Sequence, residues 1–263
     1  MRLMLAFIGG LLFISVGAVA QQDTVFNQMG TSGKKNGWWK KYYPDSTVQY
    51  IAQFKSDKPV GTVKRYFPNG KLQSLLIYQE GSDAVKAQMF SRVGTLLAEG
   101  SYVKNKKEGQ WKTYRPDGSV FYVDAYKDGV REGACDGFYP NGAPMYKYKY
   151  VGGKRVGYGI QYHENGAMME EVVYNAEGKP NSFFRAFYDS NAKRIEGKYV
   201  NGEKEGEWIT YNEDGSVFSR VMYKNGYPEI TDDMVKKETE MLRTYSKMKG
   251  KIEEPSEANI SRE

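Results

Sequence analysis

The side chains of this chain that could perform catalytic chemistry are few. The sequence has one cysteine, Cys135, and one histidine, His163, which a nucleophilic enzyme or a zinc site would need side by side. Glu170 and Glu171 offer the two carboxylates of a hydrolase, but neighbouring residues of a strand point to opposite faces, so this pair cannot act together. Whether Cys135 and His163 can act depends on the elements that carry them.

Those elements follow from an internal repeat. Residues 106–129 return as residues 203–226 with 14 of 24 positions identical. An aromatic residue closes each unit every 24 residues, with a single step of 25: Phe54, Tyr78, Tyr102, Tyr126, Tyr150, Tyr174, Tyr199 and Tyr223. A second aromatic column keeps the same phase: Tyr42, Tyr66, Phe90, Tyr114, Phe138, Tyr162, Phe187 and Tyr211. The sequence therefore predicts eight units.

Each unit has the pattern of one β-hairpin. Turn signals such as PDG at 116–118 and PNG at 140–142 recur at a fixed phase, and they are typical of a type I turn with a bulge. The runs on either side, for example Gly109–Tyr114 and Ser119–Tyr126, are short and rich in aromatic and β-branched residues, as strands are. We therefore predict an all-β repeat protein, an elongated, twisted antiparallel sheet of about eight hairpins.

The repeat also allows each candidate catalytic residue to be compared with the residues at the same position of the other units. Cys135 belongs to an inward-facing packing column with Trp39, Val63, Ala87, Trp111, Gly159, Phe184 and Trp208. His163 belongs to a column just before the turn, with Tyr43, Phe67, Tyr139 and Tyr188. Both residues are therefore expected to be structural. We predict that the protein is not an enzyme and has no catalytic, cofactor or metal site.

The best-preserved units resemble the MORN repeat in its bacterial variant form, the group that includes the YwqK-like antitoxin family. The resemblance rests on a Gly-x-Trp start, as at 109–111, on the Y-x-x-D/N-G centre, and on the closing Y-K-D/N-G, as at 126–129. It covers about residues 30–228. Arrays of this kind serve as scaffolds or docking surfaces, so the resemblance implies a fold and no single function. Units three and seven depart from the pattern, with Val85 and Ala87, and Ser182 and Phe184, in place of the Gly and Trp, and we expect them to distort the sheet.

The two ends of the chain differ from the repeat. Residues 1–20 have an apolar run and an A-x-A-like site, which are typical of a secretory signal peptide cleaved between Ala20 and Gln21. We expect residues 21–29 to be a linker, 30–229 the MORN-like array, 230–250 a C-terminal α-helix and 251–263 a disordered tail. The helix either caps the last hairpin or docks a partner. We expect an exported protein, periplasmic, outer-membrane-associated or secreted, without a transmembrane segment in the mature chain.

Charge narrows the choice of partners. The net charge of +6 falls to +5 without residues 1–20, which contain one Arg and no acid, and Lys and Glu alternate along the chain. Nucleic acid is therefore not an expected partner. The Lys–Glu pairs before the Gly-x-Trp motifs, at 107–108 and 204–205, are expected to form a solvated rim that discourages aggregation at the sheet edge.

Without a catalytic group, the aromatic surface of the sheet is the expected site of function. The predicted interaction residues are Trp39, Tyr66, Trp111, Tyr114, Tyr139, Tyr162, Trp208 and Tyr211. The first hypothesis is an envelope scaffold that holds a protein partner. The second is a module that binds glycans or anionic lipid headgroups through Trp, Tyr and Lys. The third is an antitoxin-like protein that neutralises its partner.

Overall fold

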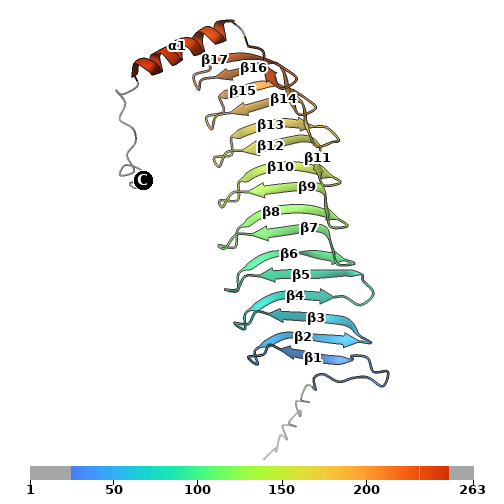
Figure 1. Cartoon of the computed structure of the whole chain (residues 1–263). Helices are drawn as coiled ribbons and strands as arrows, with labels where there is room; N and C mark the ends of the chain where they lie inside the picture. Colours follow the sequence, from blue (N-terminus) through green and yellow to red (C-terminus); the bar gives the residue numbers. More distant parts are fainter. Residues whose placement is uncertain (1–24, 231, 249–263) are drawn as a thin grey trace, which may run out of the picture.

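The computed structural model describes residues 25–230 and 232–248. The predicted signal peptide, its cleavage site at Ala20 and Gln21, and the predicted tail lie outside these residues. The described chain forms eighteen strands and one helix (Figure 1). They are β1 (Gly37–Tyr42), β2 (Val48–Lys55), β3 (Lys58–Tyr66), β4 (Leu72–Tyr78), β5 (Ala84–Phe90), β6 (Leu96–Val103), β7 (Lys106–Tyr114), β8 (Val120–Lys127), β9 (Val130–Phe138), β10 (Pro144–Val151), β11 (Lys154–Arg155), β12 (Gly157–Tyr162), β13 (Met168–Tyr174), β14 (Pro180–Phe187), β15 (Lys193–Val200), β16 (Glu203–Tyr211), β17 (Val217–Lys224), β18 (Tyr227–Pro228) and α1 (Asp232–Met248).

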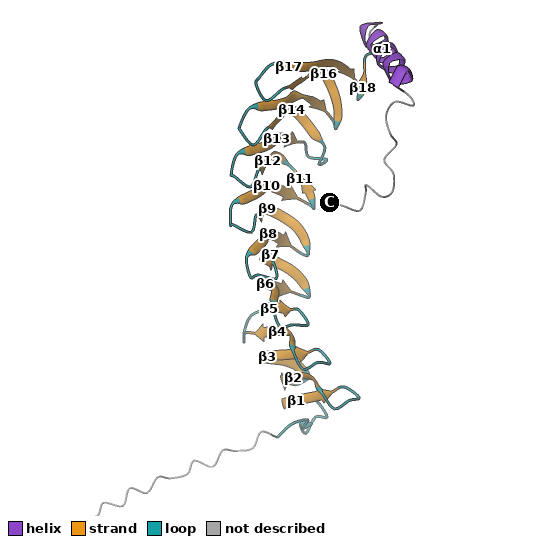
Figure 2. Cartoon of the chain, turned by 90° about the vertical axis from the view of Figure 1, so that its left-hand side faces the viewer, coloured by secondary structure: helices purple, strands orange, loops and turns teal. Residues whose placement is uncertain are grey.

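The strands form one open, single-layered antiparallel sheet. Each long strand pairs with the long strands before and after it in the sequence, while the two-residue strands β11 and β18 pair with β10 and β17. Stacked hairpins build an elongated array that curves along its length (Figures 1 and 2). The predicted all-β repeat fold is confirmed. In the part of the chain that the structure describes, no helix is long and apolar enough to cross a membrane.

Two kinds of turn alternate along the sheet. Within a unit, the turn is the predicted type I turn with a bulge: Gly118 N–H donates to Arg115 O and Arg115 N–H donates to Ser119 O, both at 2.9 Å, and Gly118 has a φ of 87°. Between most units lies a two-residue turn with both residues at positive φ, as at Asp128 and Gly129 (51° and 85°). Such turns match the natural twist of the strands, so the array twists as it is extended.

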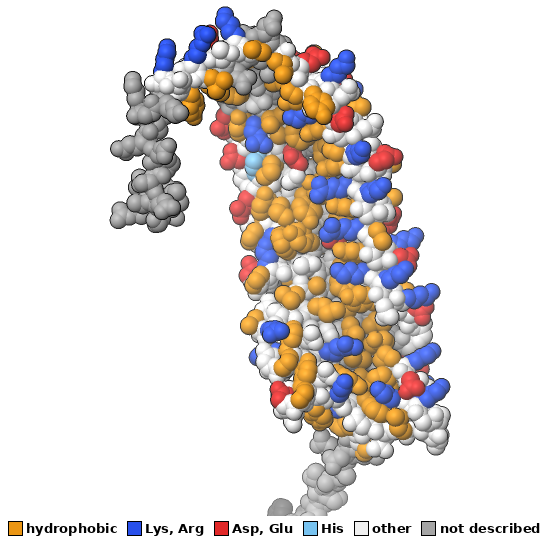
Figure 3. All heavy atoms as spheres, in the orientation of Figure 1, with side chains coloured by type: hydrophobic (Ala, Val, Ile, Leu, Met, Phe, Trp, Pro, Cys, Tyr) orange, Lys and Arg blue, Asp and Glu red, His pale blue; other side chains and the backbone are white. Residues whose placement is uncertain are grey.

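The alternation of side chains along the strands gives the sheet two different faces. We call the face with Trp39, Trp111, Trp208 and the closing aromatics the tryptophan face, and the face with Tyr66, Tyr114, Tyr162 and Tyr211 the tyrosine face. The core is a ridge along the middle of the tryptophan face, where Val63, Ala87, Trp111, Cys135 and Trp208 are buried. On the face of the array that Figure 3 shows, hydrophobic side chains form a band along its length beside Lys and Arg side chains.

The N-terminal edge of the sheet is partly covered. Phe26, in the predicted linker, forms a bridge with Trp38 of β1. Next to it, Asn27 N–H donates to Trp38 O (2.8 Å) and Lys40 N–H donates to Asn27 Oδ1 (2.9 Å). These contacts use backbone groups of β1 that would otherwise be open for pairing with another chain.

The predicted C-terminal helix is present as α1, but its described side chains do not cap the array. Val235, Met241, Leu242 and Tyr245 expose 49%, 59%, 60% and 67% of their surface. In Figures 1 and 2 the helix stands apart from β16 and β17. Of the two roles expected for this helix, capping therefore has no support among the described side chains.

Candidate functional site

The tryptophan face is built from a repeated packing arrangement, which we call a rung, and the surroundings of Trp111 show its parts. The indole is 3% exposed and lies over Gly100 of β6, where an added Cβ would come within 2.4 Å of the ring. The indole Nε1–H donates to Ser101 O (3.0 Å), and the Tyr102 ring packs edge-on with its centroid 4.9 Å away. Lys107 Nζ lies 4.5 Å from the indole centroid, where the ring attracts a cation. The rung is an aromatic layer with a cationic lid.

The same construction recurs along the array. Trp208 lies over Gly197, where an added Cβ would come within 2.3 Å of the ring, and Lys204 Nζ lies 4.4 Å from the indole centroid. In units one, five and six the lid is Lys35 over Trp39 (4.7 Å), Arg131 over Tyr150 (5.5 Å) and Arg155 over Tyr148 (3.9 Å). The position equivalent to Lys107, which we call the lid column, therefore holds a cation in most units.

The Lys–Glu pairs expected as a solvated rim have defined structural roles instead. Their lysines are the lids described above. Glu108 Oε2 accepts the N–H of Asp128 at 2.9 Å, and Glu205 Oε2 accepts the N–H of Asn225 at 2.9 Å. Each of these acceptors satisfies the turn that leads into the next unit, 20 residues further along the chain. The expectation was wrong because it treated the pair as charge alone and not as a lid and a turn acceptor.

Units two and three lack both the indole and the lid. Val63 and Ala87 stand in the packing column that contains Trp111 in unit four, which we call the tryptophan column. Pro59 and Asp83 stand in the lid column, where unit four has Lys107. The tryptophan face is consequently hollowed at this point, with a cavity of about 620 Å³. We call this feature the unit-three hollow. The predicted departure of unit three from the repeat is therefore visible as a missing rung.

The polar residues of the unit-three hollow lie at its two ends. Arg65 and Ser74 are direct cross-strand partners on β3 and β4, so their side chains share one face at the end near the within-unit turns. Lys58 and Lys104 line the opposite end, together with Asp83. Three basic side chains against one acid give the lining a net positive charge.

The middle of the unit-three hollow is apolar. Leu76 and Met89 come from β4 and β5, and Val85 lies beside them. Tyr78 and Tyr102, both closing aromatics, line the same space. Among the residues that the structure describes, no cation lies over either ring, in contrast to Tyr126, which has Lys107 Nζ at 4.8 Å.

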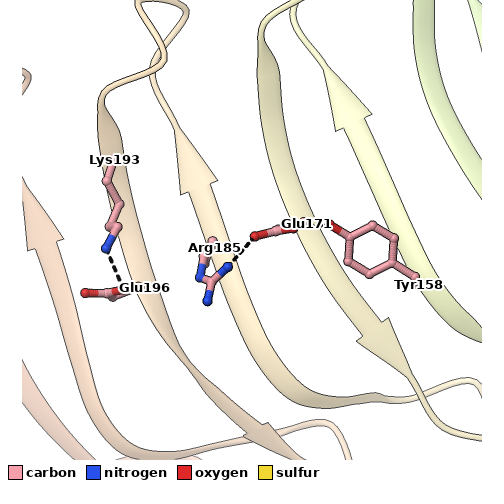
Figure 4. A network of polar contacts seen from close by, with 5 residues as sticks. All are labelled: Tyr158, Glu171, Arg185, Lys193 and Glu196. Carbon is pink, nitrogen blue, oxygen red and sulfur yellow. Dashed lines mark hydrogen bonds and ion pairs between the residues drawn. The ribbon is translucent and has the colours of Figure 1, made fainter.

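The tyrosine face carries polar contacts that run from strand to strand. Glu171 of β13 is 7% exposed, and it accepts from the Tyr158 hydroxyl of β12 and from Arg185 Nη1 of β14 at 2.9 Å. Figure 4 shows this chain of contacts, which is followed on β15 by the ion pair of Lys193 Nζ with Glu196 Oε2 at 2.9 Å. Buried polar groups that are paired in this way fix the register of neighbouring strands.

Two tyrosines of the predicted interaction surface bond to glutamates on the tyrosine face. The Tyr114 hydroxyl donates to Glu99 Oε1 at 2.6 Å, and the Tyr211 hydroxyl donates to Glu196 Oε1. These hydrogen bonds hold the pKa values of the Glu99 and Glu196 carboxyls below their usual range. Both carboxylates are therefore charged acceptors at neutral pH, unsuited to act as general acids.

The eight residues predicted as an interaction surface do not come together. Trp39, Trp111 and Trp208 are on the tryptophan face, and the last two are only 3% and 5% exposed, so they are rungs of the core. Tyr66, Tyr114, Tyr162 and Tyr211 are partly buried on the tyrosine face. Tyr139 lies at the turn edge and donates its hydroxyl to Tyr162 O (2.7 Å).

The structure also keeps the candidate catalytic residues apart. Cys135 is 1% exposed, and burial raises the pKa of its thiol to about 11, so little thiolate is present at neutral pH. His163 Nε2 lies 3.0 Å from Phe187 O, a contact that tyrosine hydroxyls make in other units. Glu170 and Glu171 pair with positions 161 and 160 and therefore project from opposite faces. No two of these groups share a site.

Sequence reasoning missed two features of the tryptophan face. Gly100 and Gly197, which make room for the indoles, each stand 11 residues before a tryptophan, and that spacing was a usable signal. The unit-three hollow was also missed. Its signal is the simultaneous loss of the column tryptophan and the lid cation in two consecutive units.

The fold and its rungs define the class of protein: an all-β repeat protein whose stacked hairpins form a single open sheet. A model of the family described as MORN repeat variant matches residues 59–80 and 204–225. The two matches lie in the second and last units of the array. These matches support a MORN-repeat protein.

A comparison with curated proteins finds no match. Among solved structures, the chain is similar to a mutant of S. aureus TarM in complex with fondaparinux, alpha-GlcNAc-glycerol and UDP (17% identity, 41% of this chain, 21% of that chain, TM-score 0.30). It is also similar to the TcdB2-TccC3-Cdc42 structure (10% identity, 70% and 12% of the two chains, TM-score 0.19) and to a porin-like protein from Bacteroides uniformis (12% identity, 72% and 91%, TM-score 0.19). The chain spans about a fifth of the TarM chain. At these TM-scores the likenesses carry no functional inference.

Proposed function

We propose that this MORN-repeat protein is a non-enzymatic scaffold that holds a protein partner along its tyrosine face in the bacterial envelope. The observation that carries the proposal is the single-layered sheet, in which the described residues place no second layer over that face. Large apolar side chains therefore remain accessible there: Trp38 is 37% exposed, Ile77 36%, Tyr158 48% and Met222 49%.

These four side chains occupy equivalent positions on the tyrosine face. Trp38 and Tyr158 are the middle residues of their Gly-x-Trp-type starts, and Ile77 and Met222 occupy the facing column of the return strands. They belong to strands spread from β1 to β17, so a partner that contacts them all extends along the array. Exposed apolar and aromatic residues rimmed by polar ones often mark a protein interface.

Location in the envelope rests on the sequence of residues 1–20. Their apolar run and small-residue site support export. A chain purified from its own cells should begin at Gln21, which N-terminal sequencing measures. A chain that retains Met1 would remove export from the proposal while leaving the scaffold role open.

Site-specific photo-crosslinking in the source cells tests the scaffold role. A benzoylphenylalanine at position 158 should yield one discrete adduct with a protein, whereas the same group at Asp117, in a within-unit turn, should yield none. Adducts of equal strength from both positions, or none from position 158, would contradict the proposal. Sedimentation of the protein with anionic vesicles or peptidoglycan, without a protein adduct, would favour the glycan or lipid-headgroup alternative.

A further inference from the structure

Units two and three, which form the unit-three hollow, lack both a large side chain in the tryptophan column and a lid cation, a combination that no other unit has. In unit seven the lid column holds Pro180, but Phe184 stands in the tryptophan column and stacks on Trp208 with centroids 5.5 Å apart. In units two and three the corresponding residues are Val63 and Ala87, which are too small to replace an indole. The missing volume is therefore left open, and about 620 Å³ lies within the usual range of small-molecule sites, roughly 300–1,000 Å³.

One end of the hollow is suited to an anion. Ser74 is only 6% exposed, and its side chain lines the hollow, where its hydroxyl can donate to a bound group. Its cross-strand partner Arg65 is exposed and forms no ion pair with any described carboxylate. A guanidinium beside a hydroxyl offers several donors to the two oxygens of a carboxylate.

The middle of the hollow is suited to an apolar group. Leu76 and Met89 lie beside the Arg65–Ser74 end, and the Tyr78 and Tyr102 side chains continue the lining toward the inter-unit turns. An apolar body here would take the place that the indole occupies in unit four, where Trp111 packs edge-on against Tyr102 at 4.9 Å. Its burial would remove water from the exposed parts of these side chains.

We propose that the unit-three hollow is a binding site for a small organic carboxylate with an apolar body. The carboxylate lies between Arg65 and the Ser74 hydroxyl, and the body lies over Leu76 and against the tyrosine rings. Lys58 and Lys104 raise the positive potential of the lining at the far end. This site is on the tryptophan face, so binding here is independent of a partner on the tyrosine face.

Calorimetric titration of the full chain with 3-phenylpropanoate and with its uncharged amide tests the proposal. The carboxylate should bind at least about tenfold more tightly than the amide, the size expected for one charge-assisted hydrogen bond. Arg65→Gln should reduce the affinity for the carboxylate by about the same factor and leave the affinity for the amide unchanged. Equal affinities for the two compounds, or no binding of the carboxylate, would overturn the proposal.

A second variant fills the hollow and uses unit four as its template. In Leu76→Gly/Ala87→Trp, the new glycine and tryptophan stand 11 residues apart, as Gly100 and Trp111 do, so the new indole can lie over the glycine. It should abolish binding of 3-phenylpropanoate while circular dichroism shows the same strand content as the parent. Undiminished binding in this variant would place the ligand elsewhere and refute the assignment. A matched control is Lys107→Gln, which changes a lid cation outside the hollow and should leave the binding unchanged.

Discussion

A methyl group added at Gly100 tests the rung most directly. In Gly100→Ala the new Cβ would lie 2.4 Å from Trp111 Cδ2 and 2.5 Å from Cε2. Carbon atoms pack at about 3.5–4.0 Å, so the ring would have to move by about 1 Å or more. The ring is held by the hydrogen bond from its Nε1–H to Ser101 O and by Tyr102 and Lys107 on either side. The strain is therefore not relieved by a simple side-chain rotation.

The expected loss follows from two opposing contributions. Overpacking of a filled core costs about 1–3 kcal/mol. Replacing glycine by alanine also restricts the unfolded chain, which stabilises by about 0.4–1 kcal/mol where the native conformation allows alanine. Gly100 does not have a positive φ, so only the steric contact opposes the methyl group. We expect a net loss of about 1–2 kcal/mol in the free energy of unfolding.

The control is the same substitution without the indole. Trp111→Ala alone should cost about 3–5 kcal/mol, because it removes a buried ring. In that background Gly100→Ala should be neutral or slightly stabilising, so its effect changes sign. Amide hydrogen exchange over β6 and β7 is the suitable assay, since repeat arrays open locally rather than in one two-state step. If Gly100→Ala is neutral in the parent chain, or if it causes an equal loss of stability in both backgrounds, the proposed packing of the Trp111 indole over Gly100 is refuted.

Three further outcomes are expected. Glu108→Ala should speed hydrogen exchange at the Asp128 amide and lower the free energy of unfolding by about 0.5–1.5 kcal/mol. Glu108→Gln should recover most of this loss, because its amide oxygen still accepts the hydrogen bond. Unchanged exchange in Glu108→Ala would contradict the turn contact. Cys135 should resist iodoacetamide at pH 8 in the native protein and react once urea unfolds the chain. Burial hides the thiol from the reagent and raises its pKa to about 11. Rapid labelling of the native protein would refute this expectation. Arg131→Met should cost about 3 kcal/mol in local stability, measured by hydrogen exchange over β8 and β9, because Asp124 is 6% exposed and pairs with Arg131 Nη2 at 3.0 Å. Asp124→Leu combined with Arg131→Met should be more stable than Arg131→Met alone, and the reverse order would contradict the pairing.

The repeat fold could be predicted because its determinants are local. The turn at Gly118 and the strands on either side lie within a single 24-residue unit, and the same pattern is written many times over. The burial of Cys135 followed from the same logic, since its column contains tryptophans in other units. Column comparison identifies a packing position even where one unit has an unusual residue.

The unit-three hollow could not be predicted in the same way because it is formed by absent side chains. Ala87 looks like any small core residue until the structure shows that the indole of Trp111 extends over the neighbouring strand at Gly100. The role of Glu108 was hidden for a related reason: Glu108 is on β7, and its partner, the Asp128 amide, lies 20 residues further along in the turn that follows β8. Both features depend on contacts between strands rather than on a pattern within one strand.

By itself, the sequence determined the number of units, the positions of the turns and the identity of the packing column, because each depends on residues close together in the chain. Only the tertiary structure decided which side chains share a face. Simple alternation would place Val120 and Tyr122 together, but a bulge pairs Tyr114 with Val120 and Thr113 with Tyr122, so the two lie on opposite faces. One extra residue in a strand reverses the side to which the following side chains point, and the pairing with the next strand determines where that happens.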